Sequence, residues 1–211
     1  MKTLAILSRK GGAGKTTLAL HLAVQAVAGG RRVALVDADP QRSAADWWRT
    51  READAPELVE VDPGDLAAVV RAAEEAGFDL VVIDTRPSAE ADAQEAAQVA
   101  DLALVVVRPS ILDLRAVNAT VSTVHAAGTP GLVVVNQAPP ARGIAEAALT
   151  REALDALQGF GLPVATTIIH ARAAFGAALI DGRAVLELEP DGKAAGEIAA
   201  LWRELETRLW L

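Results

Sequence analysis

The 211-residue sequence contains no cysteine and no tyrosine, and aromatic residues make up only 3% of it. The absence of cysteine excludes disulfides and every metal or redox site that depends on a thiolate. Its three histidines, His21, His125 and His170, are scattered and lack the spacing of metal ligands. No apolar run reaches the roughly 18 residues that indicate a membrane span. The interior must therefore be built mainly from Ala, Val and Leu.

What the sequence does contain is a large apolar fraction, 52%, together with a net charge of −8. A chain of this length and apolarity is sufficient for one domain with a large core, so we expect residues 1–211 to form a single domain. Met1 and Lys2 lead directly into an apolar segment. We therefore expect no signal peptide and a cytoplasmic location.

Apolar segments typical of buried strands alternate with helical patterns along the whole chain. Strands are predicted at residues 3–7, 32–36, 58–61, 78–83, 102–107, 132–135 and 164–169. Helices are predicted at 16–28, 41–53, 64–76, 89–99, 111–127, 143–158, 171–181 and 191–210. This alternation predicts an α/β fold, a doubly wound and mostly parallel sheet of seven or eight strands with helices on both faces.

A glycine-rich segment follows the first predicted strand and opens the first predicted helix. It reads Lys10-Gly11-Gly12-Ala13-Gly14-Lys15-Thr16-Thr17. This is the pattern of a phosphate-binding loop (P-loop), whose backbone N–H groups wrap phosphate oxygens where glycines allow a close approach. We expect Lys15 to neutralise the β- and γ-phosphates, Thr16 to bind Mg²⁺ and Thr17 to lie near the α-phosphate. The segment predicts a nucleoside triphosphate site.

Two acidic clusters stand where predicted strands end. Asp37 and Asp39 belong to the run Asp37-Ala38-Asp39-Pro40-Gln41, and Asp84 ends a later apolar run. An acid in such a place is often a turn former or a helix cap. However, ligands of parallel sheets bind at the carboxyl ends of the strands, and both clusters would lie there beside the P-loop. The combination favours a site for a nucleotide and its metal ion.

The P-loop departs from the general pattern in one specific way. Arg9 stands where glycine is usual, and Lys10 places a second lysine at the mouth of the loop. This resembles the deviant P-loop of the ParA/MinD ATPases, and Asp-x-Asp-Pro-Gln resembles their first switch motif. The resemblance implies that Lys10 reaches across a dimer interface to the partner's nucleotide. It also implies that Asp39 orients or activates the attacking water.

The same resemblance implies that Asp37 supports the Mg²⁺ shell and that Asp84 holds Mg²⁺ through a water molecule. It covers essentially the whole chain and is closest to small ParA partition ATPases without an N-terminal helix-turn-helix. It implies slow hydrolysis of ATP to ADP and phosphate, a homodimer in the ATP state, non-specific DNA binding and a ParB-like or other small activating partner. The implied location is the bacterial cytoplasm, on the nucleoid in the ATP state and not on a membrane.

Further residues resemble the family's pattern less specifically. Pro109 resembles a segment near the adenine, and Asn136 ends a strand where an Asn commonly contacts the base; an Asn there can equally be a turn residue. Arg86 departs from the small residues or prolines that usually follow the acid of the second carboxylate motif. We interpret Arg86 as a solvent-facing or interface residue.

The C-terminal region raises the question of DNA and membrane partners. The family places DNA-binding residues in this region, and the basic residues here are Arg172, Arg183, Lys193 and Arg203. They can equally be ordinary surface charges in salt bridges, since the chain is acidic overall. The last predicted helix has an apolar face but a mixed polar face with Glu as well as Arg, which favours packing on the sheet over membrane binding.

Two classes of function follow from this reading. The first is an ATPase switch that partitions or positions a plasmid, a chromosome or a protein cargo. The second is a regulatory ATPase of the same fold that controls a protein assembly without binding DNA. Salt-sensitive DNA binding in the ATP state would distinguish them.

Overall fold

The structure, a computed structural model, describes residues 1–62, 64–87, 90–141 and 146–210. Within these residues six strands pair in parallel to form one sheet. The strand order is β3-β2-β4-β1-β5-β6. The strands are β1 (Lys2–Leu7), β2 (Val33–Ala38), β3 (Glu57–Glu60), β4 (Leu80–Thr85), β5 (Leu102–Val107) and β6 (Gly131–Val135). After β4 the chain crosses β1 to reach β5, so the direction in which strands are added reverses around β1. A reversal of this kind opens a ligand crevice at the carboxyl ends of the strands.

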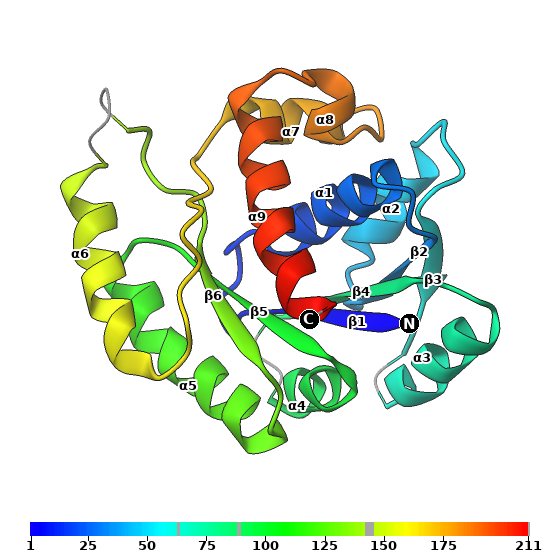
Figure 1. Cartoon of the computed structure of the whole chain (residues 1–211), viewed down its shortest axis with the longest axis horizontal. Helices are drawn as coiled ribbons and strands as arrows, with labels where there is room; N and C mark the ends of the chain where they lie inside the picture. Colours follow the sequence, from blue (N-terminus) through cyan, green and yellow to red (C-terminus); the bar gives the residue numbers. More distant parts are fainter. Residues whose placement is uncertain (63, 88–89, 142–145, 211) are drawn as a thin grey trace.

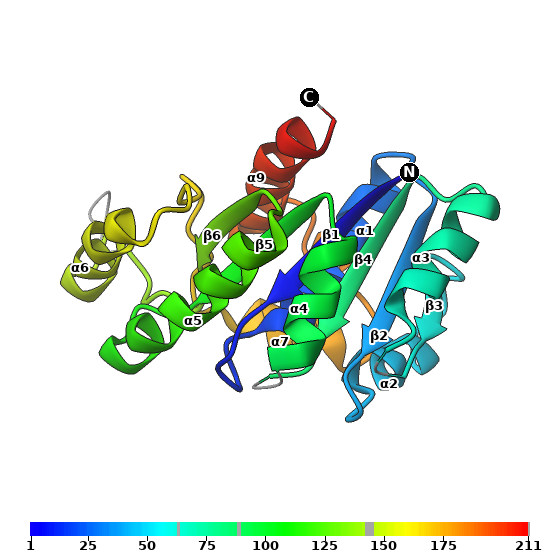
Figure 2. The ribbon, with the colours of Figure 1, turned by 90° about the horizontal axis from the view of Figure 1, so that it is seen from below.

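Helices cover both faces of the sheet (Figures 1 and 2). The first face carries α1 (Lys15–Ala28), α2 (Ser43–Arg49), α7 (Ala173–Leu179), α8 (Val185–Leu188) and α9 (Lys193–Leu209). The second face carries α3 (Leu66–Glu75), α4 (Glu90–Val99), α5 (Ile111–Ala127), α6 (Ala148–Leu157) and the short 3₁₀ helix η1 (Gln158–Phe160). Successive residues of a strand point to opposite faces. Leu4 and Ile6 of β1 accordingly enter one core, and Ala5 and Leu7 enter the other.

The predicted fold class is confirmed, but the predicted strand number is wrong. Residues 164–169 do not form a seventh strand; they pair with β6 only at their two ends, where Ala165 and Ile169 donate to the carbonyls of Val133 and Val135. Between these ends the backbone N–H groups of Thr166 and Thr167 donate to the Glu204 carboxylate of α9, at 3.0 and 2.8 Å. A regular ladder is absent there because a carboxylate binds these donors.

Most predicted elements agree with the structure to within a few residues. The strand at 102–107 and the helix at 111–127 have the predicted bounds. Residue 89 and residues 143–145, which begin two predicted helices, lie outside the described residues. The short helices α8 and η1 were not predicted, since four or three residues are too few to show a helical period.

The last helix, α9, packs on the face that carries α1 (Figure 1). Its apolar residues at helical spacing are buried in the core; they are Ile198, Leu201, Trp202, Leu205 and Leu209. The predicted packing of this helix on the domain is therefore confirmed. None of the helices in the described ranges has the length and apolarity that crossing a bilayer requires.

Candidate active site

The P-loop connects β1 to α1 through two glycines in the left-handed region. Gly12 has φ +74°, and Gly14, which caps α1, has φ +92°. Side chains other than glycine adopt this region at a cost. The loop thereby turns sharply and directs the free N–H groups of the first turn of α1 to the carboxyl edge of the sheet. A helix N-terminus in this setting is an anion site.

Two side-chain amides directly after β6 donate hydrogen bonds to the backbone of the P-loop. Asn136 Nδ2 donates to the Ala13 carbonyl oxygen over 2.7 Å, and Gln137 Nε2 donates to the Gly12 carbonyl oxygen over 3.1 Å. A Cβ atom on Gly14 would lie 2.3 Å from Asn136 Nδ2, so only glycine fits there. The loop's carbonyl groups are therefore turned back toward β6.

Lys15 lies at the start of α1 with only 6% of its surface exposed. Burial lowers the pKa of its ammonium group, whereas the carboxylates of Asp84 and Asp39 act in the opposite direction. Within the described chain no hydrogen bond holds this ammonium group. A buried ammonium group without a hydrogen-bond partner in the described chain, at the N-terminus of a helix, is suited to phosphate oxygens.

Asp84 is the penultimate residue of β4 and is fully buried. Burial raises the pKa of its carboxyl group to about 7, against the opposing charge of Lys15. Neither carboxylate oxygen has a hydrogen-bond partner among the residues that the structure describes. In register, Asp84 pairs with Ile6 of β1 and with Asp37 of β2. The sheet therefore brings the second acidic motif next to the first.

These orphaned oxygens are consistent with the predicted Mg²⁺ site. The described residues contain no group of three or more His, Cys, Asp or Glu side chains that would enclose a metal by itself. Mg²⁺ usually keeps several waters and binds one or two carboxylates together with substrate phosphates. Asp84 and the Thr16 hydroxyl fit that mode, and with phosphate oxygens they would complete a shell.

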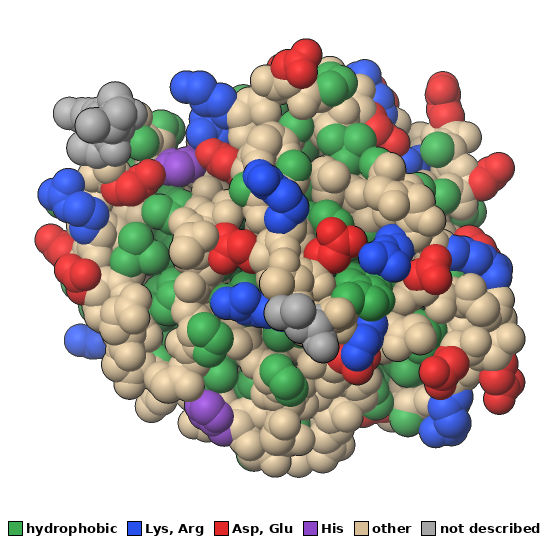
Figure 3. Space-filling view, viewed as in Figure 1, with side chains coloured by type: hydrophobic (Ala, Val, Ile, Leu, Met, Phe, Trp, Pro, Cys, Tyr) green, Lys and Arg blue, Asp and Glu red, His purple; other side chains and the backbone are tan. Residues whose placement is uncertain are grey.

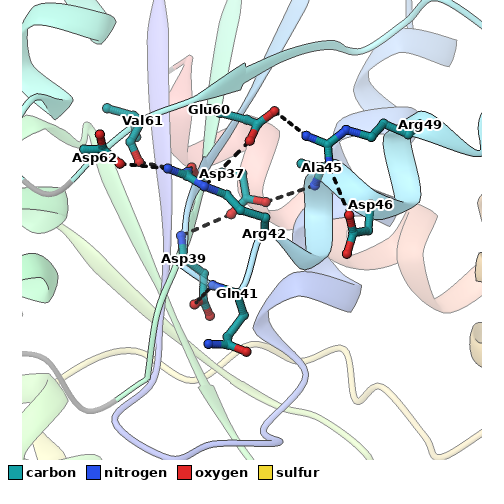
Figure 4. Close-up of polar contacts among 10 residues, drawn as sticks. All are labelled: Asp37, Asp39, Gln41, Arg42, Ala45, Asp46, Arg49, Glu60, Val61 and Asp62. Carbon is teal, nitrogen blue, oxygen red and sulfur yellow. Dashed lines mark hydrogen bonds and ion pairs between the residues drawn. The ribbon is translucent and has the colours of Figure 1, made fainter.

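Asp37 and Asp39 organise the loop that follows β2 (Figure 4). Asp37 accepts from the N–H of Asp39 at 3.1 Å and from that of Ala45 in α2 at 2.9 Å, so both of its oxygens are bound by backbone N–H groups. Asp39 accepts from the Gln41 N–H at 2.9 Å and is partly exposed. The geometry therefore makes Asp37 a support of the loop and leaves Asp39 facing solvent at its tip. The support of the Mg²⁺ shell by Asp37 stays a prediction.

Lys10 stands at the mouth of the P-loop with its ammonium group unpaired within the described residues. It borders a small crevice together with Asp113 and Ala116 of α5. Its neighbour Arg9, in contrast, lies 3.5 Å from Glu90. Lys10 is thus free to interact outside its own chain, as its predicted role in a dimer requires.

A cavity of about 400 Å³ adjoins the P-loop on the side of α7. Its lining comprises Thr17, Leu18, Asn136, Gln137, His170, Ala171, Arg172, Ala173 and Phe175. The position next to Thr17 is suitable for the base and sugar of a nucleotide, and Asn136 is among the lining residues. Its contact with the base stays a prediction. Pro109 is buried in the turn before α5 and does not line this cavity. Its contact with adenine therefore stays a prediction.

Arg86 forms an ion pair with Asp92 of α4, a residue of the same chain. The predicted location at the surface is in agreement with its partial exposure. The pair directs the guanidinium group toward α4.

The four basic residues predicted to bind DNA have different surroundings. Arg172 lines the cavity and pairs with Glu197, and Arg183 pairs with Asp181 at 2.7 Å. Lys193 and Arg203 have no carboxylate partner in the part of the chain that the structure describes. Lys and Arg are interspersed with Asp and Glu over the face that carries α9 (Figure 3). The structure therefore does not bring the four together as one free basic cluster.

Sequence reasoning missed Gln137 and Arg42, which contact the P-loop and the loop after β2. Both are non-glycine residues with positive φ, +54° and +52°. A glutamine or an arginine carries no sequence signal for that conformation, since glycine or asparagine is usual there. Gln137 directly follows Asn136, and this position was the only sequence signal that could have identified Gln137 as part of the site.

Comparisons with known proteins agree with this geometry. "Maintenance of carboxysome distribution protein A" of Halothiobacillus neapolitanus is 34% identical over 204 residues, covering 92% of this chain and 91% of that protein. The protein of the same name from Gloeobacter kilaueensis is 36% identical over 215 residues, covering 99% and 94%. Both alignments therefore extend far beyond the P-loop.

Solved structures share the fold. Apo McdA from Cyanothece superposes with a TM-score of 0.80 at 19% identity, covering 97% of this chain and 99% of that one. MinD from Pyrococcus horikoshii complexed with Mg-ADP gives 0.78 at 18% identity, covering 100% and 99%. The sequence profile of the CobQ/CobB/MinD/ParA nucleotide binding domain matches residues 4–185. A P-loop with an added lysine, two acidic strand ends and a match over this length together establish that the chain belongs to the CobQ/CobB/MinD/ParA nucleotide-binding family.

Proposed function

We propose that this protein is an ATPase switch that binds MgATP, dimerises and positions a cargo within the cell. The observation that carries the proposal is the convergence of Lys15, Asp39 and Asp84 at one edge of the sheet, with Lys10 unpaired beside them. A triphosphate would give Lys15, Asp39 and Asp84 a ligand to act on, and a second subunit would give Lys10 a partner. The proposed domain is the whole chain, 1–211.

The chemistry is the transfer of the γ-phosphoryl group to water. Water attacks the γ-phosphorus, the bond to the β–γ bridging oxygen breaks, and ADP and phosphate leave. Lys15 and the N–H groups of α1 hold the phosphates, and Asp39 orients the water and accepts its proton. Mg²⁺, bound by Thr16 and through a water by Asp84, would neutralise charge on the β- and γ-phosphates. Lys10 of the partner subunit would add positive charge to the same phosphates.

The proposed cargo is a large protein assembly. Two relatives that align with almost the whole chain are named for maintaining carboxysome distribution, and this supports a protein cargo over a plasmid or a chromosome. A switch of this kind needs a surface to bind in its ATP state and a partner that triggers hydrolysis. We propose that the surface is nucleoid DNA, contacted by Lys193 and Arg203. The partner would be a small protein on the cargo, and the switch would act in the cytoplasm.

The second candidate is an ATPase of the same mechanism that does not bind DNA. Two observations favour it, the pairing of Arg172 and Arg183 with carboxylates and the net charge of −8. Phosphate binding needs a local basic patch, and paired arginines are poor contributors to one. Binding of the ATP-loaded protein to DNA at low and at raised salt distinguishes the candidates.

The enzymatic part is tested by measuring ATP binding and phosphate release by the purified protein. We expect MgATP binding and slow turnover, since a switch needs its partner for fast hydrolysis. Lys15→Ala should remain folded and lose nucleotide affinity, because the charge that holds the phosphates is gone. Tight MgATP binding by Lys15→Ala, or a fast rate without any partner, would contradict the proposal.

A further inference from the structure

Arg42 holds the loop that carries Asp39 through four contacts of its guanidinium group (Figure 4). Nη1 donates to the carbonyl oxygens of Asp37, at 2.6 Å, and of Val61, at 2.9 Å. Nη2 donates to Asp62 Oδ1 at 2.9 Å, and Nε lies 3.7 Å from Glu60 Oε2. The end of β2 is thereby connected to the segment that follows β3.

The backbone of Arg42 is strained at the same place. Its φ of +52° lies in the left-handed region, where a long side chain is unfavourable and glycine is not. The Arg42 N–H donates to the Asp39 carbonyl oxygen at 2.8 Å, closing the turn that places Asp39 at its tip. A non-glycine residue persists in this conformation when the surroundings over-determine it. The four guanidinium contacts are such a determinant.

Arg42 and Asp39 lie on opposite sides of the loop. The guanidinium group lies toward Val61 and Asp62, whereas the Asp39 carboxylate points away from them (Figure 4). The Arg42 side chain therefore does not lie on the side of the loop where Asp39 would meet the nucleotide and the attacking water. It acts on the backbone, through the Asp37 carbonyl and the turn that begins at Asp39.

We propose that Arg42 is a positioning residue for Asp39. The inference rests on the proposed function, because it assigns Arg42 to the step in which Asp39 orients water. The guanidinium group fixes the ends of the turn, so the Asp39 carboxylate is held in one direction before nucleotide binds. Water attack requires this direction to be correct, and small displacements of a reacting group are costly in rate.

Arg49 shows how Arg42 differs from an ordinary surface arginine. Arg49 pairs with Asp46 at 2.9 Å and with Glu60 at 2.6 Å, and its side chain is 52% exposed. Within the described residues it has no hydrogen bond or ion pair with residues 37–42. Arg42 shares Glu60 with it, but its side chain is only 25% exposed and two of its acceptors are backbone carbonyls. Arg49→Ala is therefore a matched control.

The test compares Arg42→Asn, Arg42→Gly and Arg49→Ala in the full-length protein. Asn and Gly both tolerate positive φ, so neither introduces backbone strain, and Asn avoids the added flexibility of glycine. We expect kcat for ATP to fall about tenfold to a hundredfold in both Arg42 variants, with the Kd for ATP changed by less than about threefold. Arg49→Ala should retain the kcat of the wild type.

Amide hydrogen exchange of the peptide that contains residues 37–45 gives a second measurement that needs no hydrolysis. Both Arg42 variants should exchange faster there than the wild type, and no faster elsewhere. An unchanged kcat in the Arg42 variants would overturn the proposal, as would equal losses of ATP affinity and kcat, which indicate a purely structural role. If the wild type does not hydrolyse ATP, the proposed function fails, and unchanged exchange would then overturn the positioning role by itself.

Discussion

The side-chain amide of Asn136 donates a hydrogen bond to the carbonyl oxygen of Ala13 over 2.7 Å, joining the end of β6 to the middle of the P-loop. Asn136 is only 4% exposed, so water does not replace this bond easily. The same side chain lines the cavity beside Thr17. Asn136 thus supports the phosphate site and borders the proposed base site at the same time.

Removal of this amide should weaken the P-loop. In Asn136→Ala the Ala13 carbonyl loses its buried donor, which costs about 1–3 kcal/mol of the free energy of unfolding. We expect ATP affinity to fall about tenfold, equivalent to about 1.4 kcal/mol of binding free energy. Calorimetric titration with ATP and denaturant unfolding measure the two effects. Gln137→Ala is the control, since Gln137 is exposed and its bond is longer. Wild-type affinity in Asn136→Ala would show that the P-loop does not need this support.

Asp39→Ala should separate nucleotide binding from turnover. Asp39 is predicted to act on the attacking water and not on ATP itself, so ATP affinity should be retained while phosphate release is lost. We expect kcat to fall by about a hundredfold or more, the range for loss of a general base. Asp46→Ala removes an exposed carboxylate from the following helix and serves as the control. Phosphate release at the wild-type rate in Asp39→Ala would refute the assignment.

Lys10→Ala should bind MgATP as a monomer. The Lys10 ammonium group is unpaired in its own described chain, and its proposed partner is the triphosphate of the second subunit. A lysine supplies a compact charge to phosphates in a site that closure makes drier. The control is Lys2→Ala, which removes a lysine that pairs with Asp101. In sedimentation velocity with a slowly hydrolysed ATP analogue, the wild type and Lys2→Ala should form dimers, whereas Lys10→Ala should stay a monomer. Equal dimerisation of Lys10→Ala would remove the main argument for contact in trans.

His21 should make the protein less stable in acid. Burial lowers the pKa of its imidazole from 6.5 to about 4, against the opposing charge of Glu187, and its Nδ1 accepts from the Val185 N–H. The unfolded chain binds the proton more readily, so this stability is complete above about pH 6.5 and decreases as the pH falls to about 4. The expected loss is roughly 3 kcal/mol of unfolding free energy.

The measurement is denaturant unfolding at pH 7 and at pH 4, on the wild type and on His21→Asn. Asn offers an acceptor oxygen in place of Nδ1 and does not titrate, so the difference between the two pH dependences isolates the imidazole. Identical pH dependences would mean that His21 is not the source of the acid sensitivity.

DNA binding in the ATP state should depend on Lys193 and Arg203 and not on Arg172. Lys193 and Arg203 lack carboxylate partners in the described residues, whereas the charge of Arg172 is neutralised by Glu197. Each free cation lost should reduce the slope of log K against log salt by about one. Fluorescence anisotropy with duplex DNA at several salt concentrations tests this. Weaker binding by Arg172→Ala than by Lys193→Ala would contradict it, and no binding by the wild type would support the second candidate function.

The sequence by itself determined the parts of this protein that depend on local pattern. Near-continuous apolar runs predicted β1, β2, β4, β5 and β6, because strands covered on both faces must be apolar at every position. The glycine spacing before Lys15 predicted the P-loop, because few residues adopt positive φ and admit a phosphate. Asp37 and Asp84 were recognised because each directly follows such an apolar run, and Asp39 because it belongs to the motif that starts at Asp37.

Only the tertiary structure decided the contacts between distant segments. Asn136 reaches Ala13 from 123 positions away. Glu204 binds the N–H groups of Thr166 and Thr167, so a segment of strand-like composition never completes a strand. Arg42 adopts a conformation that its side chain disfavours because acceptors near Asp37 and Val61 hold it. Hydrogen bonds of this kind depend on which atoms the fold brings within about 3 Å, and no local propensity encodes that distance.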